Sequence, residues 1–367
     1  MSGAARALPL PAASPAVRVM LCDDSAVIRG AIARMLEADP AVRVVARAGN
    51  GQAAVDELRR TPVDVLVLDI EMPVMDGMTA LPLLLRADPG LKVIMASTLT
   101  TSGADIALRA LRLGAADYLP KPSSIGTAGN ETFRRELLAK VKGLARLRQR
   151  ALHPVPSQPV PEAPAAQLRP APRTQPRLLA VGSSTGGPQA LFTLVQGLGR
   201  ALPVPVVLTQ HMPATFTPIL ADHLAKLGGA PCAEARDGDM LRAGHILLAP
   251  GDRHLLVETA GTGLRVRLSD GPPENYCRPS VDPMLRSAAA ACGGRVLVAM
   301  LTGMGRDGLD GTRCVVEAGG AAVAQDEATS VVWGMPGAIA QAGLCHAVLP
   351  LPRIAPKLLD LMRAVRA

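Results

Sequence analysis

Three short loops, each following an apolar run, carry the residue types that acyl transfer needs. The segments GSSTGG, QHMP and TGMGRDG supply a hydroxyl, an imidazole and a carboxylate at Ser184, His211 and Asp307. The runs before these loops are short, β-branched and without alternation, as expected of strands buried on both faces of a parallel sheet. Since ligands bind beyond the carboxyl ends of such strands, the three residues should meet at one crevice. A serine, a histidine and an aspartate at that place indicate nucleophilic catalysis.

The first loop has the Gly-x-Ser-x-Gly form of a nucleophile elbow, in which small residues allow a sharp turn from strand to helix. We predict Ser184 as the nucleophile. Ser183 is the competitor if the turn begins one residue earlier, but it lacks the spacing to Gly186. The Thr185 amide is the expected oxyanion donor, because the helix that follows, near Pro188 to Val195, directs its positive end at the same place.

The other two loops complete the predicted catalytic set. His211 would take the serine proton and return it to the leaving group, and Asp307 would accept from the other ring nitrogen. The chain order Ser, His, Asp differs from the order Ser, Asp, His of an α/β-hydrolase, so an ordinary lipase or esterase is not expected. A histidine after a strand and an aspartate in a glycine-rich loop are commonly structural, so their joint occurrence with the elbow carries the prediction.

A rival interpretation makes GSSTGGP the phosphate loop of a nucleotide-binding fold. The first Gly-x-Gly is broken by Ser184, and no lysine follows as it does in a P-loop. About twenty residues further on, Val206 to His211 contain no acidic residue to bind a ribose. The sequence therefore favours the elbow.

A second set of polar residues follows apolar runs in the first third of the chain, at Asp23-Asp24, Asp69, Ser97 and Lys121. In a parallel sheet of order 2-1-3-4-5, the first and third strands flank the switch point, so the three carboxylates should converge. A hard divalent cation such as Mg²⁺ would relieve their repulsion. We predict a phosphoryl-acceptor site with Asp69 as nucleophile, Lys121 paired with the transferred group and the Ser97 hydroxyl donating to it.

The predicted catalytic residues and the predicted phosphoryl-acceptor residues need separate α/β domains to position them. A length of 367 residues suits two domains. Five strand and helix units alternate before the linker, which predicts a flavodoxin-like, open parallel sheet, and a second alternation after it predicts a Rossmann-like doubly wound domain. Residues 153–176 contain eight prolines, typical of a linker with polyproline II character. The expected divisions are a disordered tail (1–15), a first domain (16–150), a linker (151–176) and a catalytic domain (177–367).

Composition excludes several classes of protein. The six cysteines form no C-x-x-C pair, so neither a zinc site nor a disulfide framework is expected, and a reducing compartment, the cytoplasm, fits best. The proline-broken N-terminal segment is unlike a signal peptide. Two uncharged stretches, 178–199 and 201–221, are interrupted by Gly, Pro, Ser and Thr, so no membrane span is predicted.

The net charge of +8 arises partly from RRELLAKVKGLARLRQR at residues 134–150. A solvated helix face is the first interpretation, an acidic protein partner the second and DNA the third. With six aromatic residues in the chain, no platform for stacking single-stranded bases is expected. A DNA-binding output domain would need a helix-turn-helix pattern, which we do not find.

The segments LCDDSAVIRG, VLDIEMPVMDG, MAST and DYLPKP resemble a response-regulator receiver, over about residues 17–149. This resemblance implies that Asp23, Asp24 and Asp69 hold Mg²⁺, that a histidine kinase phosphorylates Asp69, and that Ser97 and Tyr118 occupy the switch positions.

The later segments GSSTGG, QHMPATFT, APGDRHLLV, RPSVDPMLRSAA, LTGMGRDG and AQDEATSVVWGMP resemble the catalytic domain of chemotaxis-specific protein-glutamate methylesterases. This resemblance implies a triad of Ser184, His211 and Asp307, with the Met304 backbone at the oxyanion site and no cofactor for the reaction. The implied substrates are γ-glutamyl methyl esters and certain glutamines of chemoreceptors. The family usually has a His or an Asn-rich turn where Tyr276-Cys277 stands, a departure that concerns the substrate groove.

Overall fold

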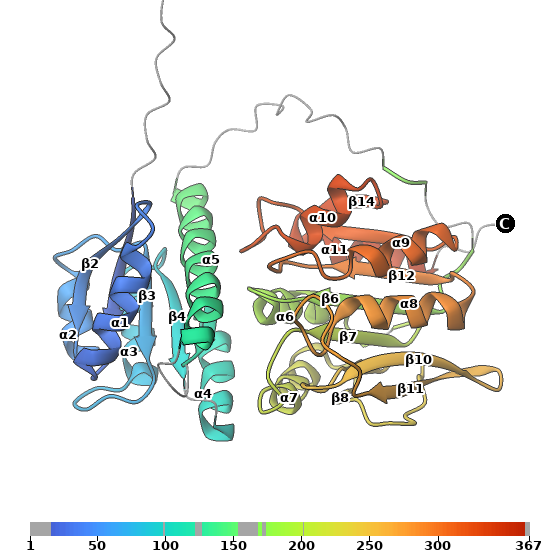
Figure 1. The fold of residues 1–367 in the computed structure, drawn as a ribbon, viewed down its shortest axis with the longest axis horizontal. Helices are drawn as coiled ribbons and strands as arrows, with labels where there is room; N and C mark the ends of the chain where they lie inside the picture. The colour runs from blue at the N-terminus through green and yellow to red at the C-terminus, as the bar shows by residue number, and fades with distance from the viewer. Residues whose placement is uncertain are drawn as a thin grey trace, which may run out of the picture.

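The computed structural model describes residues 16–97, 100–121, 127–152, 168–170, 174–200 and 202–363. Figure 1 shows two α/β units that face each other across helix α5. The predicted disordered tail and most of the predicted linker lie outside the described residues. Within the part of the chain that is described, no helix combines the length and the apolar character needed to cross a membrane.

The N-terminal unit is a five-stranded parallel sheet in the predicted order β2-β1-β3-β4-β5. All five residues of β3 are buried, as a strand covered by helices on both faces requires. Its strands are β1 (Val17–Cys22), β2 (Val42–Ala48), β3 (Val65–Asp69), β4 (Lys92–Ser97) and β5 (Asp117–Pro120). Its helices are α1 (Ala26–Glu37), α2 (Gly51–Leu58), α3 (Gly77–Ala87), α4 (Thr101–Arg112) and α5 (Thr127–Leu152).

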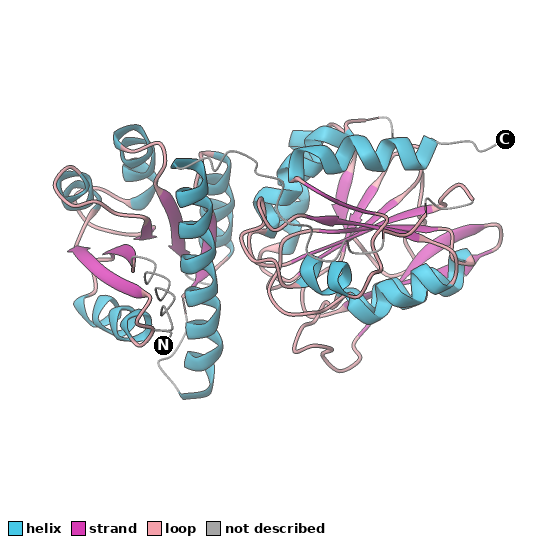
Figure 2. Cartoon of the chain, turned by 90° about the horizontal axis from the view of Figure 1, so that it is seen from above, coloured by secondary structure: helices cyan, strands magenta, loops and turns pink. Residues whose placement is uncertain are grey.

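The C-terminal unit is a seven-stranded parallel sheet of order β14-β13-β12-β6-β7-β9-β8, with helices on both faces (Figure 2). Its strands are β6 (Leu178–Ser183), β7 (Val206–Gln210), β8 (Cys232–Glu234), β9 (Ile246–Leu248), β12 (Val296–Met300), β13 (Ala321–Gln325) and β14 (Ala347–Leu349). Its helices are α6 (Gly187–Leu198), α7 (Thr217–Gly228), α8 (Val281–Cys292), α9 (Leu309–Glu317), α10 (Met335–Gln341) and α11 (Leu351–Arg363). The predicted α/β fold class is confirmed for both units.

The regular alternation predicted for the second unit is interrupted by an antiparallel hairpin of β10 (His254–Ala260) and β11 (Gly263–Ser269). The sequence prediction missed this hairpin. One face of it is buried, with Leu255 and Val257 on β10 packed beside Val266 on β11. Such alternation of buried and exposed positions is the pattern of an antiparallel pair.

The middle of the large sheet brings the three predicted catalytic loops to one edge. Strand β6 lies between β12 and β7, with Gly182 paired to Met300 and Ser183 paired to Gln210. The loops that follow β6, β7 and β12 therefore leave the sheet side by side, because parallel strands share their carboxyl ends.

The receiver-like unit contacts the second unit through β5. The rings of Tyr118 on β5 and Phe216 are stacked, with centroids 4.9 Å apart. The buried carboxylate of Asp117 accepts a hydrogen bond from the backbone amide of Gly186 at 3.1 Å and lies 3.1 Å from Nζ of Lys140 on α5. The loop that contains Ser184 is thus hydrogen-bonded to a strand of the other unit.

Helix α5 forms a further part of this interface, beside the contacts of β5 and of α4. A Cβ on Gly143 would lie 2.0 Å from the carbonyl oxygen of Val331, so the helix passes this loop at backbone contact distance. The guanidinium of Arg146 lies 3.1 Å from Glu327 and also donates to the carbonyl of Ser330.

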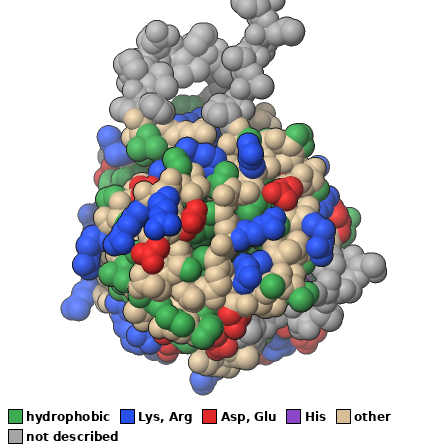
Figure 3. Space-filling model, turned by 90° about the vertical axis from the view of Figure 1, so that its left-hand side faces the viewer, with side chains coloured by type: hydrophobic (Ala, Val, Ile, Leu, Met, Phe, Trp, Pro, Cys, Tyr) green, Lys and Arg blue, Asp and Glu red, His purple; other side chains and the backbone are tan. Residues whose placement is uncertain are grey.

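The first interpretation of the basic stretch, a solvated helix face, is therefore wrong in part. Lys140 and Arg148 are buried, the latter paired with Asp88 at 2.8 Å, because this side of α5 packs within the chain. On the outer face of the N-terminal unit, Lys and Arg side chains are interspersed with Asp and Glu side chains (Figure 3).

Candidate active site and acidic cluster

Ser184 lies at the turn between β6 and α6, where glycine is needed for two reasons. Gly186 adopts a left-handed conformation with φ of 74°, and a Cβ on Gly187 would lie 1.9 Å from Oε1 of Gln210. The hydroxyl of Ser183 is buried and donates to the same Gln210 oxygen at 2.7 Å. Ser184 is partly exposed, so of the two candidate hydroxyls it is the one open to a substrate.

His211 follows β7, and its ring is fixed from the side of Asp307. The distance from His211 Nε2 to Asp307 Oδ2 is 2.7 Å. Burial lowers the pKa of His211, but the hydrogen bonds to Asp307 and Cys277 outweigh burial and raise that pKa to about 10. Burial also raises the pKa of Asp307, yet its hydrogen bond with His211 and its other donors hold that pKa well below the usual range. The pair can stabilise an imidazolium.

Asp307 is held by a dense set of donors, three of which lie at the N-terminus of α8. These are the Ser280 hydroxyl at 2.6 Å, the amides of Val281 at 2.6 Å, Asp282 at 3.1 Å and Gly308 at 2.9 Å, and the Asn275 side chain at 3.1 Å. An ionised carboxylate suits this place because amides at a helix N-terminus bind negative charge. The orientation of His211 is therefore determined by a carboxylate that has little freedom to move.

The second nitrogen of His211 faces a thiol. Sγ of Cys277 lies 3.3 Å from Nδ1 of His211. Among the described residues, the Ser184 hydroxyl makes no hydrogen bond with the imidazole. The structure thus brings His211 and Asp307 into contact and places Ser184 on the adjacent turn, since the His211 amide donates to the Ser183 carbonyl at 3.1 Å.

The third loop lies against Ser184. The Ser184 amide donates to the carbonyl of Thr302 at 3.0 Å, and a Cβ on Gly303 would lie 2.9 Å from Cβ of Ser184. Met304 follows directly. In the described part of the chain we find no acceptor for the amides of Thr185 or Met304, the two predicted oxyanion donors.

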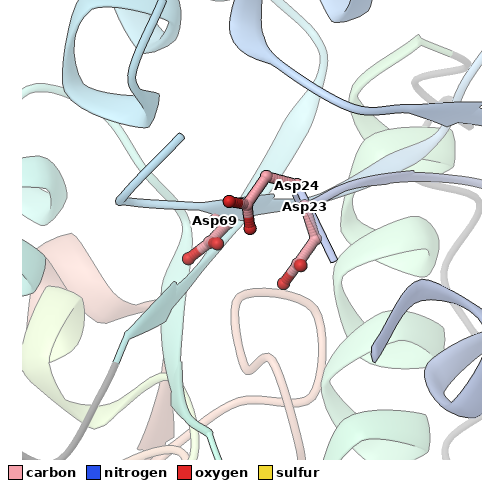
Figure 4. Close-up of side chains that lie close together, drawn as sticks. All are labelled: Asp23, Asp24 and Asp69. Atoms are coloured by element: carbon pink, nitrogen blue, oxygen red, sulfur yellow. The ribbon is translucent and has the colours of Figure 1, made fainter. Parts of the chain in front are cut away.

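The acidic cluster lies at the carboxyl edge of the N-terminal sheet (Figure 4). Carboxylate oxygens of Asp23, Asp24 and Asp69 lie within 4.8 Å of one another. Nζ of Lys121 lies 2.8 Å from Asp23 and 2.7 Å from Asp69. Three carboxylates against one ammonium leave an excess of negative charge on oxygen ligands, which suits a divalent cation such as Mg²⁺.

Burial and charge shift the titration of this cluster. Burial raises the pKa of Asp69 above its usual value, although Lys121 acts in the opposite direction. Burial alone would lower the pKa of Lys121, but the hydrogen bonds to Asp23 and Asp69 raise it. The hydroxyl of Ser97 is buried and has no hydrogen-bond partner among the described residues. A polar group of this kind is available to a ligand at the strand end.

Sequence reasoning missed several residues that the site uses. Gln210 holds the serine turn, Ser280 holds Asp307, and Asp117 contacts the loop of Ser184. Cys277, which the sequence placed in the substrate groove, contacts His211 instead. A serine directly before a helix, as at Ser280, is a recognisable signal. No local pattern could assign Asp117 to a contact with Gly186, because the two belong to different units.

Two family profiles match the chain. The profile of the response regulator receiver domain matches residues 19–128, and the profile of the CheB methylesterase matches residues 179–358. The two matches follow the two units of the fold.

Curated relatives resemble the chain over almost its whole length. The protein-glutamate methylesterase/protein-glutamine glutaminase 1 of Paramagnetospirillum magneticum is 54% identical over 370 residues, covering 95% of this chain and 97% of the relative. The protein of the same name from Rhodospirillum rubrum is 54% identical, covering 92% and 93%. The crystal structure of the Thermotoga maritima CheB methylesterase catalytic domain is 36% identical, with a TM-score of 0.50, and covers 51% of this chain and 100% of that one.

Proposed function

Because this chain belongs to the family of protein-glutamate methylesterases/protein-glutamine glutaminases with a receiver domain, we propose that it hydrolyses glutamyl methyl esters on chemoreceptors and deamidates specific receptor glutamines. The observation that supports the chemistry is the His211–Asp307 pair at 2.7 Å, on the turn next to Ser184. The site lies at the carboxyl edge of a parallel sheet, where substrates of such folds bind.

In the proposed mechanism, the Ser184 hydroxyl attacks the ester carbonyl while His211 removes its proton. Since Nε2 of His211 is engaged by Asp307, the proton goes to Nδ1. The tetrahedral intermediate collapses when Nδ1 returns the proton to the leaving methanol, or to ammonia from a glutamine. Water then enters by the same route and releases glutamate.

The oxyanion of the tetrahedral intermediate must be stabilised by hydrogen-bond donors. The Thr185 amide lies in the same loop as Ser184, and the Met304 amide lies in the loop packed against it. Both are proposed to donate to the oxyanion. One such donor contributes about 3–4 kcal/mol to lowering the barrier. The N-terminus of α6 adds a positive potential at the same turn.

The receiver unit is proposed to accept a phosphoryl group from a histidine kinase at Asp69. Mg²⁺, bound by Asp23, Asp24 and Asp69, would neutralise phosphoryl oxygens. Lys121 lies beside Asp69, where it can pair with the transferred group, and the unpartnered Ser97 hydroxyl can donate to it. The buried Tyr118 occupies the second switch position and stacks on Phe216 of the other unit.

We further propose that the unphosphorylated receiver restrains the esterase and that phosphorylation weakens this contact. Tyr118 lies next to Asp117, which accepts from the Gly186 amide in the nucleophile turn. A change at the switch position would therefore reach the catalytic loop through two neighbouring residues of β5. We also propose that the protein is cytoplasmic and that its partners are chemoreceptors and a histidine kinase, with no nucleic acid and no membrane insertion.

A DNA-binding output remains the alternative from another class. On the face drawn in Figure 3, basic and acidic side chains are interspersed, so that face is no continuous basic stripe of the kind that binds nucleic acid. Binding to duplex DNA that falls steeply with salt would favour the alternative.

Methanol release from methylated receptor tests the proposal. Ser184→Ala should lower the rate roughly 10⁶-fold, to the background, because the acyl-enzyme cannot form. Ser102→Ala, at an exposed serine on α4, is the matched control and should retain the wild-type rate. Equal rates for Ser184→Ala and the control would overturn the proposed mechanism.

A further inference from the structure

A tight turn projects Cys277 toward the catalytic histidine. Glu274 and Cys277 exchange backbone hydrogen bonds of 3.1 and 2.9 Å, with Asn275 and Tyr276 between them at φ of 51° and 63°. Two central residues at positive φ define a type I′ turn, a conformation in which a bulky tyrosine is rare and strained. Tyr276 is 96% exposed, whereas the side chains of Asn275 and Cys277 reach the active site.

The thiol, the imidazole and the carboxylate form a continuous chain. Cys277 Sγ lies 3.3 Å from His211 Nδ1, and His211 Nε2 lies 2.7 Å from Asp307. This is the constellation that activates cysteine in nucleophilic enzymes, because the imidazole takes the thiol proton and the carboxylate stabilises the resulting imidazolium. Cys277 is also partly exposed, so a small reagent can reach it.

The other five cysteines differ in this respect. Among the described residues, none of them is hydrogen-bonded to a histidine. Burial raises the pKa of Cys22, Cys232 and Cys345 to about 12 in each case. Cys314 on α9 is partly exposed like Cys277, without an imidazole partner, and is a matched internal reference.

We propose that Cys277 is a modification site, a thiol activated by His211 that reacts with hydrogen peroxide and with soft carbon electrophiles. We expect modification of Cys277 to block the esterase as well. This second expectation rests on the proposed function.

Hydrogen peroxide oxidises the Cys277 thiol with His211 as the proton carrier. The thiol S–H bond breaks and the proton moves to Nδ1 of His211. The thiolate attacks one peroxide oxygen, the S–O bond forms, the O–O bond breaks, and hydroxide leaves. Hydroxide takes the proton from Nδ1 and becomes water. Sulfur loses two electrons, peroxide gains them, and the product is a sulfenic acid that an added thiol reduces.

Modification of Cys277 would also affect the proposed esterase, because both reactions use Nδ1 of His211. Ser184 must transfer its proton to Nδ1, since Nε2 is held by Asp307. A sulfenic acid or an alkyl group on Cys277 adds atoms within contact of Nδ1, so it competes for this nitrogen and narrows the approach of the substrate. Modification should therefore lower the catalytic rate without removing any of the residues Ser184, His211 and Asp307.

Labelling measures the reactivity without reference to esterase activity. The full chain is treated with limiting iodoacetamide at pH 7, and the modification of each cysteine is followed by mass spectrometry. Cys277 should react at least about 10-fold faster than Cys314. His211→Gln should reduce the rate at Cys277 to about that at Cys314, while the buried Cys22 and Cys345 stay unlabelled and report an intact fold. Equal rates at Cys277 and Cys314 in the wild type, or an unchanged rate at Cys277 in His211→Gln, would overturn the proposal.

A second measurement tests whether oxidation of Cys277 inhibits the esterase. Wild type, Cys277→Ala and Cys314→Ala are treated with hydrogen peroxide, and the ratio of treated to untreated methanol release is compared within each protein. The ratio should fall about 10-fold or more in the wild type and in Cys314→Ala, recover after addition of a thiol, and stay near one in Cys277→Ala. An equal fall in Cys277→Ala would assign the loss to other residues, such as methionines, and contradict the inference. An untreated wild type with no esterase activity would instead contradict the proposed function and leave the labelling result standing.

Discussion

At the scale of single residues, Asp307 controls how the imidazole titrates. Its buried carboxylate accepts from the side chain of Ser280 and from amides at the start of α8, so it stays ionised through the range in which enzymes work. An ionised carboxylate against Nε2 favours the protonated ring, and with Cys277 it raises the pKa of His211 to about 10. A general base acts in its neutral form, so activity should increase with pH toward that value.

Asp307→Asn should reverse this effect. Without the carboxylate the imidazolium is less stable, so the pKa of His211 falls and the rising limb of kcat/KM moves to lower pH. The rate should also fall about 10⁴-fold, as expected when a triad carboxylate is replaced by an amide. Methanol release by wild type and Asp307→Asn, measured from pH 6 to pH 10, tests the direction of this shift. A rising limb of kcat/KM at the same pH in both proteins would contradict the role assigned to Asp307.

At the scale of elements, helix α5 is linked to the nucleophile turn through the loop of Val331, in addition to the direct hydrogen bond from β5. Its Gly143 leaves no room for a side chain against Val331, and Val331 in turn contacts Gly186, where a Cβ would lie 2.5 Å from its methyl group. Helix α5, the loop of Val331 and the nucleophile turn are thus three layers in contact. Displacement of helix α5 should therefore change the position of Ser184.

Gly143→Ala provides a test at this scale. Alanine favours a helix over glycine by about 1 kcal/mol, so the receiver itself should not be destabilised. The added methyl group clashes with the Val331 carbonyl, and an overpacking cost of about 1–2 kcal/mol at the interface should raise methanol release without phosphodonor about 5- to 30-fold.

Gly30→Ala in α1 is the matched control, because a Cβ there lies 3.6 Å from Arg34, an ordinary contact. It should leave the activity unchanged. A Gly143→Ala variant with wild-type activity and a wild-type melting temperature would argue against restraint through this helix.

At the scale of the whole molecule, the two units each have a sheet of their own but share buried contacts. Val331 of the catalytic unit belongs to the same apolar cluster as Phe133, Leu137 and Val141 on α5. Asp117 and Lys140 form a buried ion pair at this boundary, which is sensitive to geometry because neither charge is solvated. The interface therefore has both apolar and polar parts that a switch could alter.

Removing the receiver should release the esterase. A fragment beginning at Arg177 is expected to exceed the full chain, assayed without phosphodonor, about 5- to 150-fold, the range of typical coupling free energies. In the full chain, a small phosphodonor with Mg²⁺ should raise activity, and Asp69→Asn should abolish that response. A folded fragment, checked by circular dichroism, that is no more active than the full chain would exclude inhibition by the receiver.

The sequence by itself determined the parallel sheets and their helices, and it predicted which groups are reactive. Short buried strands predicted both parallel sheets, and the ends of those strands predicted Ser184, His211, Asp307 and the acidic cluster, because strand ends in such sheets are recognisable from local pattern. The hairpin of β10 and β11 was missed, since its burial depends on α8, which lies further along the chain.

Only the tertiary structure decided which groups face one another. Nothing in the local pattern directs the Cys277 thiol to Nδ1 of His211, Asp117 to the nucleophile turn, or Lys140 into a buried pair. Each of these contacts joins residues more than 20 positions apart. Such contacts depend on how helices and loops pack, and packing is a property of the whole chain rather than of any segment.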